Sequence, residues 1–273
     1  MNVARSPAEL GPGRRVAAVG ILDGVHRGHR RLVEALLEDA DRSGLAPIVV
    51  VVDPAPGTDP MLTTVDRRLE LLGELGVEDA LVAPAEADGR LLADRVLRPA
   101  GVERVVSAAR GAAFFERLGF PTMAVPELEG VSTAAIRDAL ATGEIEAAAR
   151  MLGRPHEVEG EVIGGDARGR TLGFPTANLA VPPRLALPPY GIYAGAADGH
   201  RAAISIGVNP HYGGDELRVE AFLLDFADDL YGSRLRLELW RRLRDEREFA
   251  SEQELVDQIA RDVEQTRTAI RPG

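Results

Sequence analysis

The spacing of apolar residues changes once along this chain, near residues 152–155. Before that point, short apolar runs alternate with amphipathic segments that have the period of a helix. Strands are expected at residues 15–22, 48–52, 80–82, 102–106 and 123–125, and helices at 29–44, 64–75, 91–97, 132–140 and 144–151. Strands that alternate with helices build a parallel sheet, so the sequence predicts a doubly wound α/β domain of Rossmann type over residues 14–152.

After that point, short β segments are separated only by clusters of glycine and proline. They are expected at residues 157–163, 192–197, 202–207, 218–224 and 235–239, and a single helix capped by Ser251 runs to about Thr268. Strands without helices between them are typical of an antiparallel barrel or sandwich. The predicted fold class is therefore α/β followed by mainly β, with a second domain over residues 153–273.

Composition excludes several classes of function. The 273 residues include no cysteine, so the chain has no disulfide, no thiolate zinc site and no cysteine nucleophile. The 32 basic residues are all arginine and face 43 acidic ones, and this net charge of −11 excludes bulk binding of nucleic acid. The longest apolar run, residues 47–52, is far shorter than the roughly 20 residues that span a bilayer, and residues 1–15 lack the core of a signal peptide. We expect a cytoplasmic protein with small-molecule partners.

The first motif lies between the first expected strand and the first expected helix. It reads G-I-L-D-G-V-H-R-G-H, and its candidate nucleotide-binding residues are Gly20, Asp23, His26 and His29. Ligands bind at this edge of an open α/β sheet, and two imidazoles near free helix amides could stabilise a phosphate during nucleotidyl transfer. A pair of solvated loop histidines is the alternative interpretation.

The helix start at residues 131–137 is a second candidate nucleotide-binding segment. Ser132 opens this helix and Arg137 follows one turn later, which suits a triphosphate. Taken alone, the pattern is also that of an ordinary capped helix.

The glycine-rich stretch at residues 164–178 is the most specific pattern in the chain. Glycines allow backbone amides to approach phosphates, and the candidates for ATP are Gly164, Gly169, Gly173, Thr176 and Asn178. The side-chain oxygens of Thr176 and Asn178 are also candidate ligands of Mg²⁺. The Lys-Ser/Thr ending of a Walker loop is missing, and a plain glycine-rich hairpin is the alternative.

Phosphoryl transfer to an alcohol also needs a base, and Glu220 is the candidate. It stands among apolar residues in an expected strand, although periodicity alone favours a place on the solvent face. The remaining histidines, His156, His200 and His211, stand singly in loop-like segments and are expected to be exposed.

Taken in order, these motifs resemble the prokaryotic bifunctional riboflavin kinase/FAD synthetase family from about Arg15 to Thr268. The segments that match the family lie at residues 20–29, 131–137, 169–178, 220–232 and 243–249. The resemblance implies an N-terminal nucleotidyltransferase-like domain with the H-x-G-H motif, and a C-terminal riboflavin-kinase-like barrel. It further implies that Thr176 and Asn178 bind Mg²⁺ and ATP phosphate, that Glu220 activates the 5′-hydroxyl of riboflavin, and that Arg244 lies near the flavin. The expected product is FMN.

The N-terminal half departs from the family pattern. Residues 54–56 read P-A-P where the family has P-H-P, and residues 107–113 lack the aspartate, the aromatics and the second glycine of a loop thought to hold the flavin. Thr133 and Ala134 replace a serine and a threonine, and Phe222, in the other half, replaces a histidine. We therefore expect an N-terminal domain that binds a nucleotide but makes FAD poorly or not at all.

Two other functions remain open at the level of sequence. A fully bifunctional enzyme would also convert FMN to FAD, which the retained His26, His29 and Arg137 allow. A flavin- or nucleotide-binding regulator without turnover is the alternative from another class. Sequence does not distinguish riboflavin from a modified flavin or deazaflavin as acceptor, and it does not indicate the oligomeric state.

Overall fold

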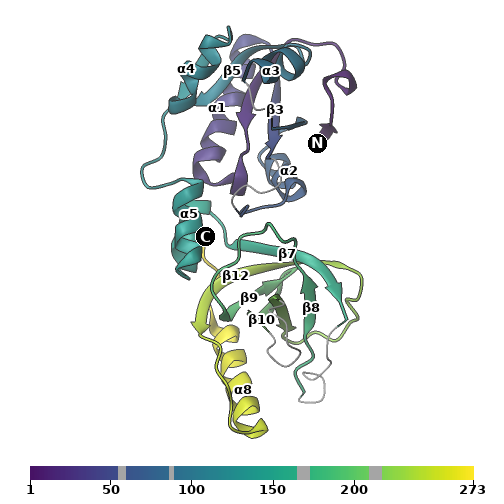
Figure 1. Ribbon diagram of the computed structural model, residues 1–273, viewed down its shortest axis with the longest axis vertical. Coiled ribbons are helices and arrows are strands. Elements are labelled where there is room, and N and C mark those ends of the chain that lie inside the picture. The colour runs from purple at the N-terminus through teal and green to yellow at the C-terminus, as the bar shows by residue number, and fades with distance from the viewer. Residues whose placement is uncertain (55–59, 86–88, 165–172, 209–216) are drawn as a thin grey trace. The chain divides into compact units, whose positions relative to one another are not determined.

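The computed structural model describes residues 1–54, 60–85, 89–164, 173–208 and 217–273, which form two compact units (Figure 1). The first unit comprises Met1–Asp59 and Thr63–Thr133, and the second comprises Pro60–Leu62 and Ala134–Gly273. The first is built on a parallel sheet and the second on a closed barrel. This confirms the prediction of an α/β part followed by a mainly β part.

A six-stranded sheet in the order β1-β4-β3-β2-β5-β6 forms the centre of the first unit. Its strands are β1 Asn2–Ala4, β2 Arg15–Gly20, β3 Ala46–Asp53, β4 Asp79–Pro84, β5 Val102–Ala108 and β6 Thr122–Val125, and every pairing is parallel. Apolar residues on both faces bury β2 and β3 from two sides, since Val16 and Val49 face one core and Ala17 and Ile48 face the other. The sequence did not predict β1, because three residues show no periodicity.

Helices cover both faces of this sheet. They are α1 Arg27–Ser43, α2 Val65–Glu74, α3 Gly89–Leu92 with the π-helical turn Ala93–Leu97, and α4 Ala109–Arg117. Helices α1 and α2 pack on one core, and the π-helical turn and α4 pack on the other. Thr64 caps α2 as predicted, accepting a hydrogen bond from the Arg67 amide at 3.1 Å. The doubly wound arrangement is confirmed.

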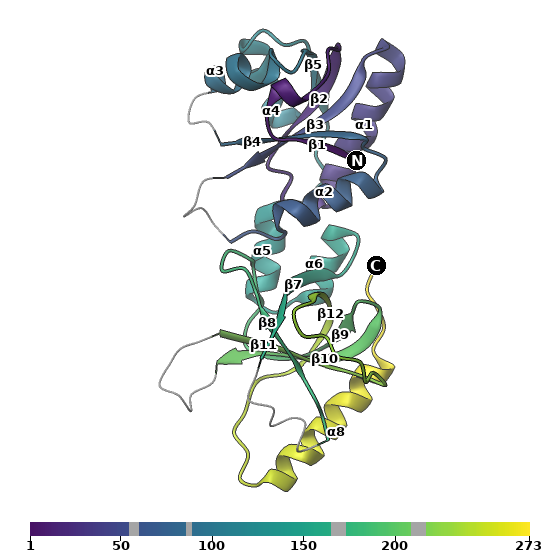
Figure 2. The same ribbon diagram turned by 90° about the vertical axis from the view of Figure 1, so that its right-hand side faces the viewer.

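The second unit contains a closed antiparallel barrel in the order β10-β11-β8-β7-β12-β9, with β9 also pairing with β10. Its strands are β7 His156–Ile163, β8 Ala177–Ala180, β9 Gly191–Ala197, β10 His200–Val208, β11 Leu217–Leu223 and β12 Arg234–Arg244. Strand β8 was missed, because it directly follows the glycine- and proline-rich stretch. Helix α8, Glu252–Thr268, contacts β9 and β10 on the outside of the barrel (Figure 2), and Ser251 caps it as predicted.

Two segments that precede the barrel in sequence pack into its core. Helices α5, Thr133–Ala141, and α6, Ile145–Leu152, contribute buried apolar residues to the same cluster as the barrel strands. The compact units therefore divide at Thr133, whereas the motifs divide the chain at residue 152. No helix in the described ranges is both long and apolar enough to cross a membrane.

The tripeptide Pro60–Leu62 also belongs to the second unit. Met61 forms a parallel bridge with Leu185: its amide donates to the Arg184 carbonyl at 2.6 Å, and its carbonyl accepts from the Ala186 amide at 2.7 Å. Leu62 is only 1% exposed and lies within the barrel core. The second unit is therefore discontinuous in sequence.

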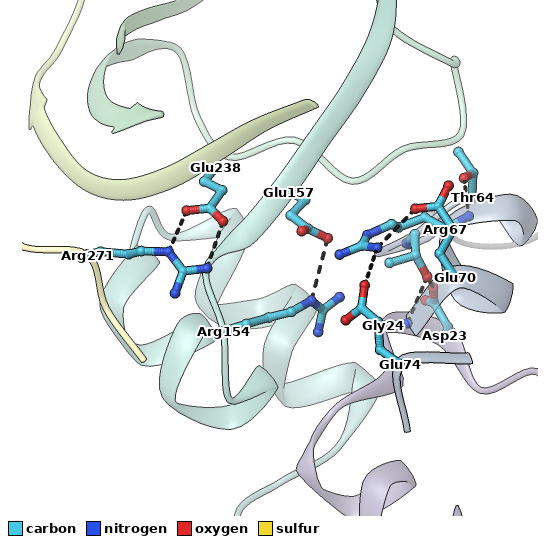
Figure 3. A network of polar contacts seen from close by, with 11 residues as sticks. Asp23, Gly24, Thr64, Arg67, Glu70, Glu74, Arg154, Glu157, Glu238 and Arg271 are labelled. Carbon is cyan, nitrogen blue, oxygen red and sulfur yellow. Dashed lines mark hydrogen bonds and ion pairs between the residues drawn. The ribbon is translucent and has the colours of Figure 1, made fainter. Parts of the chain in front are cut away.

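Arginine supplies the cation of the ion pairs that fix each unit (Figure 3). On α2, Arg67 lies 3.0 Å from both Glu70 and Glu74. In the second unit, Arg271 donates two hydrogen bonds of 2.7 Å to Glu238. Two parallel bonds from a guanidinium give a fixed geometry, so the residues after α8 are held against β12.

Candidate active sites

The turn between β2 and α1 has an unusual backbone conformation. Leu22 has φ of 52° directly before a short 3₁₀ turn, Asp23–Val25, in which Gly24 has φ of 78° and Val25 has φ of 39°. Positive φ is rare for residues other than glycine and is an outlier for a β-branched one, at a cost of about 1–3 kcal/mol. Gly20 ends β2 just before this turn. Strain of this kind persists only where neighbouring contacts fix it.

Those contacts come from the start of α2. The buried Asp23 carboxylate accepts hydrogen bonds from the Thr63 amide at 3.1 Å and from the Thr63 hydroxyl at 3.3 Å. The same hydroxyl accepts from the Gly24 amide at 3.0 Å. Arg68, only 1% exposed, donates to the carbonyls of Ile21 and Thr63. In these contacts Asp23 holds the turn that presents the two histidines.

His26 and His29 stack on each other, with ring centroids 3.7 Å apart and planes 17° from parallel. His26 is the N-cap of α1, and its Nδ1 accepts from the amides of Gly28 at 3.1 Å and His29 at 3.4 Å. When the His26 ring is neutral, these hydrogen bonds place its proton on Nε2. Two of the helix amides that we expected to be free for a phosphate are engaged by His26 instead.

The pKa of His29 lies well below its usual value. Burial is the main cause, and the positive potentials of His26, Arg110 and Arg68 add to it. His29 is therefore neutral near neutral pH. In that form it can donate a hydrogen bond to a phosphate, but it does not supply a full positive charge.

The lowered pKa of His29 predicts that the first unit loses stability in acid. The contribution of neutral His29 to the free energy of unfolding is complete above its unfolded pKa of 6.5. It is lost as the pH falls from there toward the lower pKa of His29 in the folded state. The protection of the β2 and α1 amides, measured as their hydrogen-exchange rates relative to the intrinsic rate at each pH, should therefore fall between about pH 7 and pH 5. The variant His29→Gln should weaken this dependence, whereas His200→Gln, at an exposed position of the barrel, should leave it unchanged. Equal pH dependence in all three proteins would contradict the prediction.

Ser132 and Arg137 fall on either side of the division between the compact units. Ser132 directly precedes α5, as expected, and belongs to the first unit. Arg137 lies one turn into α5 within the second unit, where its Nη2 is 3.9 Å from the Met61 sulfur. The two residues thus belong to different compact units.

Residues 107–113 form no separate loop between β5 and α4. The strand continues to Ala108 and the helix begins at Ala109. A Cβ added at Gly111 would lie 2.7 Å from the Ser107 hydroxyl, so glycine allows this direct passage from strand to helix. Of the P-A-P segment, Pro54 is described, and Ala55 and Pro56 lie outside the described residues.

Thr176, Asn178 and Glu220 meet on the barrel. Asn178 of β8 is the register partner of Glu220 in β11, and the Thr176 hydroxyl donates to Glu220 Oε2 at 3.1 Å. Val219 and Ala221 belong to the barrel core, so Glu220 points to the outer face of the sheet. Ser205 of β10 lies opposite Glu220 on the other side. At the level of sequence, only the resemblance to the family indicated that Thr176, Asn178 and Glu220 act in one site.

Two cavities meet at Thr176. The first, of about 510 Å³, is lined by Thr176 and Asn178 together with residues 226–231. The second, of about 560 Å³, is lined by Thr176 and Glu220 together with Phe222 and residues 244 and 246–249. Thr176 is therefore common to both cavities, whereas its partner Glu220 lines only the second of the two. Gly164 and Gly173 flank a segment outside the described residues, which includes Gly169.

Helix α8 fixes Arg244 at the edge of the second cavity. Arg244 donates to Asp262 through Nη2 at 2.7 Å and through Nε at 3.0 Å, and Asp262 is 3% exposed. Gln258 donates to the same carboxylate at 2.8 Å. Phe174 and Phe222 add an edge-to-face aromatic pair with centroids 5.4 Å apart. The second cavity therefore combines an apolar wall with a guanidinium of fixed orientation.

Comparison with known proteins matches both halves. A riboflavin kinase family model matches residues 152–270 and an FAD synthetase model matches residues 11–88. The bifunctional riboflavin kinase/FMN adenylyltransferase of Escherichia coli K12 is 33% identical to this chain, over 96% of this chain and 93% of that protein. The bifunctional riboflavin kinase/FMN adenylyltransferase of Bacillus subtilis is 30% identical, over 91% of this chain and 90% of that protein. This chain belongs to that family. A crystal structure described as a macrolide-efflux protein from Streptococcus pneumoniae superposes with a TM-score of 0.85 at 27% identity, over 98% of this chain and 99% of that one.

Membership in the bifunctional riboflavin kinase/FMN adenylyltransferase family makes this chain an enzyme with a riboflavin kinase domain and an FAD synthetase domain. Riboflavin kinases use ATP and a flavin, and the two adjoining cavities fit a pair of small-molecule substrates. Within the described ranges no cluster of three or more histidine, aspartate or glutamate side chains could hold a metal ion. The neutral oxygens of Thr176 and Asn178 fit Mg²⁺ that is bound mainly through ATP phosphates and water.

One prediction for the histidines outside the motifs, that His156 is exposed, was wrong. His156 is 1% exposed, and its Nε2 lies 2.9 Å from the Ala186 carbonyl, so it is a satisfied core residue of the barrel and not a surface one. His200 is exposed as predicted and packs edge-on against Phe226. His211 lies outside the described residues.

Sequence reasoning missed several residues of this chain that organise its candidate sites. Asp262 carried a usable signal: it follows Leu255 and Ile259 at helical spacing, and all three line the second cavity. Nothing in the sequence indicated the role of Thr63, because its hydrogen bonds join it to Asp23, which is 40 residues away in the chain. Glu246 is the glutamate of the L-R-x-E-x-x-F segment at residues 243–249 that resembles the family, but the sequence alone suggested no role for it.

Proposed function

We propose that the second unit phosphorylates the 5′-hydroxyl of riboflavin with ATP and Mg²⁺, and that Glu220 is the general base. The observation that carries this proposal is the position of Glu220, bonded to Thr176 where the two cavities meet. ATP occupies the first cavity, next to Asn178. The flavin occupies the second, beside Arg244 and Phe222.

Glu220 can act without rearrangement of the barrel. The Thr176 hydroxyl bonds to Oε2, so Oε1 is the oxygen proposed to take the proton of the substrate hydroxyl. As the hydroxyl oxygen bonds to the γ-phosphorus, the bond from phosphorus to the bridging oxygen of ADP breaks and the hydroxyl proton passes to Glu220. Mg²⁺, when bound, neutralises charge on the phosphate oxygens. Asp262 keeps Arg244 in a fixed orientation at the flavin.

For the first unit we propose that a nucleotide binds near His26 and His29 and that adenylylation of FMN is weak or lost. Three features support this. Strand β5 passes directly into α4 where the family pattern has a flavin loop, and His26 engages two helix amides that a phosphate could otherwise use. His29 is neutral, so the turn supplies less positive charge than two imidazolium groups would.

Full bifunctionality is the second candidate. The FAD synthetase match over residues 11–88 and the bifunctional activities that name the relatives favour it. The stacked histidines retain hydrogen-bonding groups for an adenylyl transfer that needs little acid–base help, since the phosphate of FMN is already an anion.

One assay separates these functions. The purified chain is incubated with ATP, Mg²⁺ and either riboflavin or FMN, and the flavins are then separated by chromatography. We expect FMN from riboflavin and little or no FAD from FMN. Rapid formation of FAD from FMN would establish the bifunctional alternative. No ADP and no FMN from riboflavin would overturn the kinase proposal, and modified flavins tested in parallel would show whether the acceptor differs.

A further inference from the structure

A second carboxylate lies beside Glu220 on the outer face of the barrel. Glu246, in the segment between β12 and α8, lines the second cavity, and it also lines a third cavity of about 160 Å³. Glu220 and Ser205 line both of these cavities as well. Glu246 therefore shares with the proposed base the space in which the flavin would bind.

Glycine at position 207 makes room for Glu246. A Cβ built on Gly207 would overlap both carboxylate oxygens of Glu246, so the carboxylate rests directly on the main chain of β10. Gly207 lies two residues from Ser205, the register partner of Glu220, and thus on the same face of the sheet. Any larger residue at this position would displace the Glu246 side chain.

Basic residues line the same cavities as Glu246, with Arg244 and Arg247 at the second and Arg218 at the third. Within the described part of the chain its carboxylate forms no hydrogen bond or ion pair, and the nearby Arg244 is bonded to Asp262. Burial raises the pKa of Glu246, Arg244 opposes this, and the negative charge of Glu220 raises it further. Because Glu220 and Glu246 line the same two cavities, a ligand bound there would lie beside both carboxylates.

This charge acts differently on the substrate and on the product of the proposed kinase. Riboflavin is neutral at its 5′ end, whereas the phosphate of FMN carries a charge near −1.5 to −2 at neutral pH. Repulsion from two fixed carboxylates disfavours only the phosphorylated flavin. Glu220 is bonded to Thr176 and is the proposed base, whereas the proposed transfer assigns no step to Glu246.

We propose that Glu246 is a specificity-determining residue of the kinase site, whose charge selects the neutral flavin alcohol against its phosphate ester and so favours release of FMN. This inference rests on the proposed kinase function. It concerns selectivity between substrate and product and not the rate of the phosphoryl transfer.

The test measures product inhibition of the full-length enzyme. Initial rates of ADP formation are recorded with varied riboflavin and added FMN, because adenylylation yields pyrophosphate and does not contribute to ADP. For Glu246→Gln we expect the inhibition constant of FMN to fall roughly fivefold, as for removal of one partly screened charge several ångströms away, with less than about a twofold change in the KM of riboflavin. The control Glu252→Gln makes the same charge change at an exposed position that lines none of these cavities and should alter neither constant.

Salt provides a second readout. Raising the ionic strength should tighten FMN inhibition of the wild-type enzyme and affect the Glu246→Gln enzyme less, because salt screens the repulsion. An unchanged inhibition constant in Glu246→Gln would overturn the inference. So would parallel weakening of riboflavin and FMN, which would mean that Glu246 hydrogen-bonds the flavin. If the wild-type enzyme forms no ADP with riboflavin, it is the kinase proposal that fails.

Discussion

The variant Glu220→Gln is expected to form FMN with a kcat lower by a factor of roughly 10²–10⁴, the usual contribution of a positioned general base. The amide is nearly isosteric and can still accept a hydrogen bond from Thr176, but it cannot take the proton of the substrate hydroxyl. The measurement is the initial rate of FMN formation under saturating ATP and riboflavin. Titration of riboflavin fluorescence should show that the flavin still binds.

The matched control for this variant is Glu161→Gln, at an exposed position on β7 that lines none of the three cavities. It should keep wild-type kcat. A Glu220→Gln enzyme that retains activity within a few fold of wild type would remove Glu220 from the role of base, and Thr176 would then be the residue to examine. A loss of riboflavin binding together with kcat would instead indicate a damaged second cavity.

The variant Leu62→Ala is expected to lower the free energy of unfolding of the barrel by about 2–5 kcal/mol, the usual cost of truncating a fully buried leucine. Leu62 is 1% exposed and packs in the barrel core, although the sequence places it between elements of the other unit. Trp240, the single tryptophan, lies in β12, so its fluorescence during denaturant unfolding reports on this unit.

Leu72→Ala is the control for this measurement. Leu72 is fully buried in the first unit, and its truncation removes the same apolar volume. We expect Leu62→Ala to shift the Trp240 transition to lower denaturant by more than Leu72→Ala does. A larger shift for Leu72→Ala would show that Leu62 does not stabilise the barrel. The comparison between the two variants avoids the assumption that a chain with two units unfolds in one step.

The sequence predicted those parts of the fold that depend on local periodicity. The apolar run that became β3, the amphipathic pattern of α1 and the serine cap of α8 were all readable, because each signal lies within a few consecutive residues. Strand β8 was not readable, since four residues after a glycine- and proline-rich stretch show no period of two.

Long-range contacts explain the rest of what was missed. The Thr63 hydrogen bonds to Asp23 and the core position of Leu62 depend on segments that meet only after folding. His26 also took an unexpected role, because its Nδ1 reaches back to the Gly28 amide and makes the ring a helix cap. The residues of the kinase site could be named through the family resemblance. Their meeting at the junction of two cavities could not, because it depends on the register between β8 and β11.

The bridge between Met61 and Leu185 constrains how this gene could be divided. A fragment that begins at residue 153 would contain every barrel strand, yet it would lack Leu62 and the apolar residues of α5 and α6 that fill the same core. It would also leave the Arg184 carbonyl and the Ala186 amide without the partners that Met61 provides. Residues 63–133 are, in effect, an insertion within the polypeptide of the barrel unit. Gene fission at residue 153 would therefore require new residues to complete the barrel core. A cut within residues 63–133 would instead leave Pro60–Leu62 on one fragment and the rest of the second unit on the other.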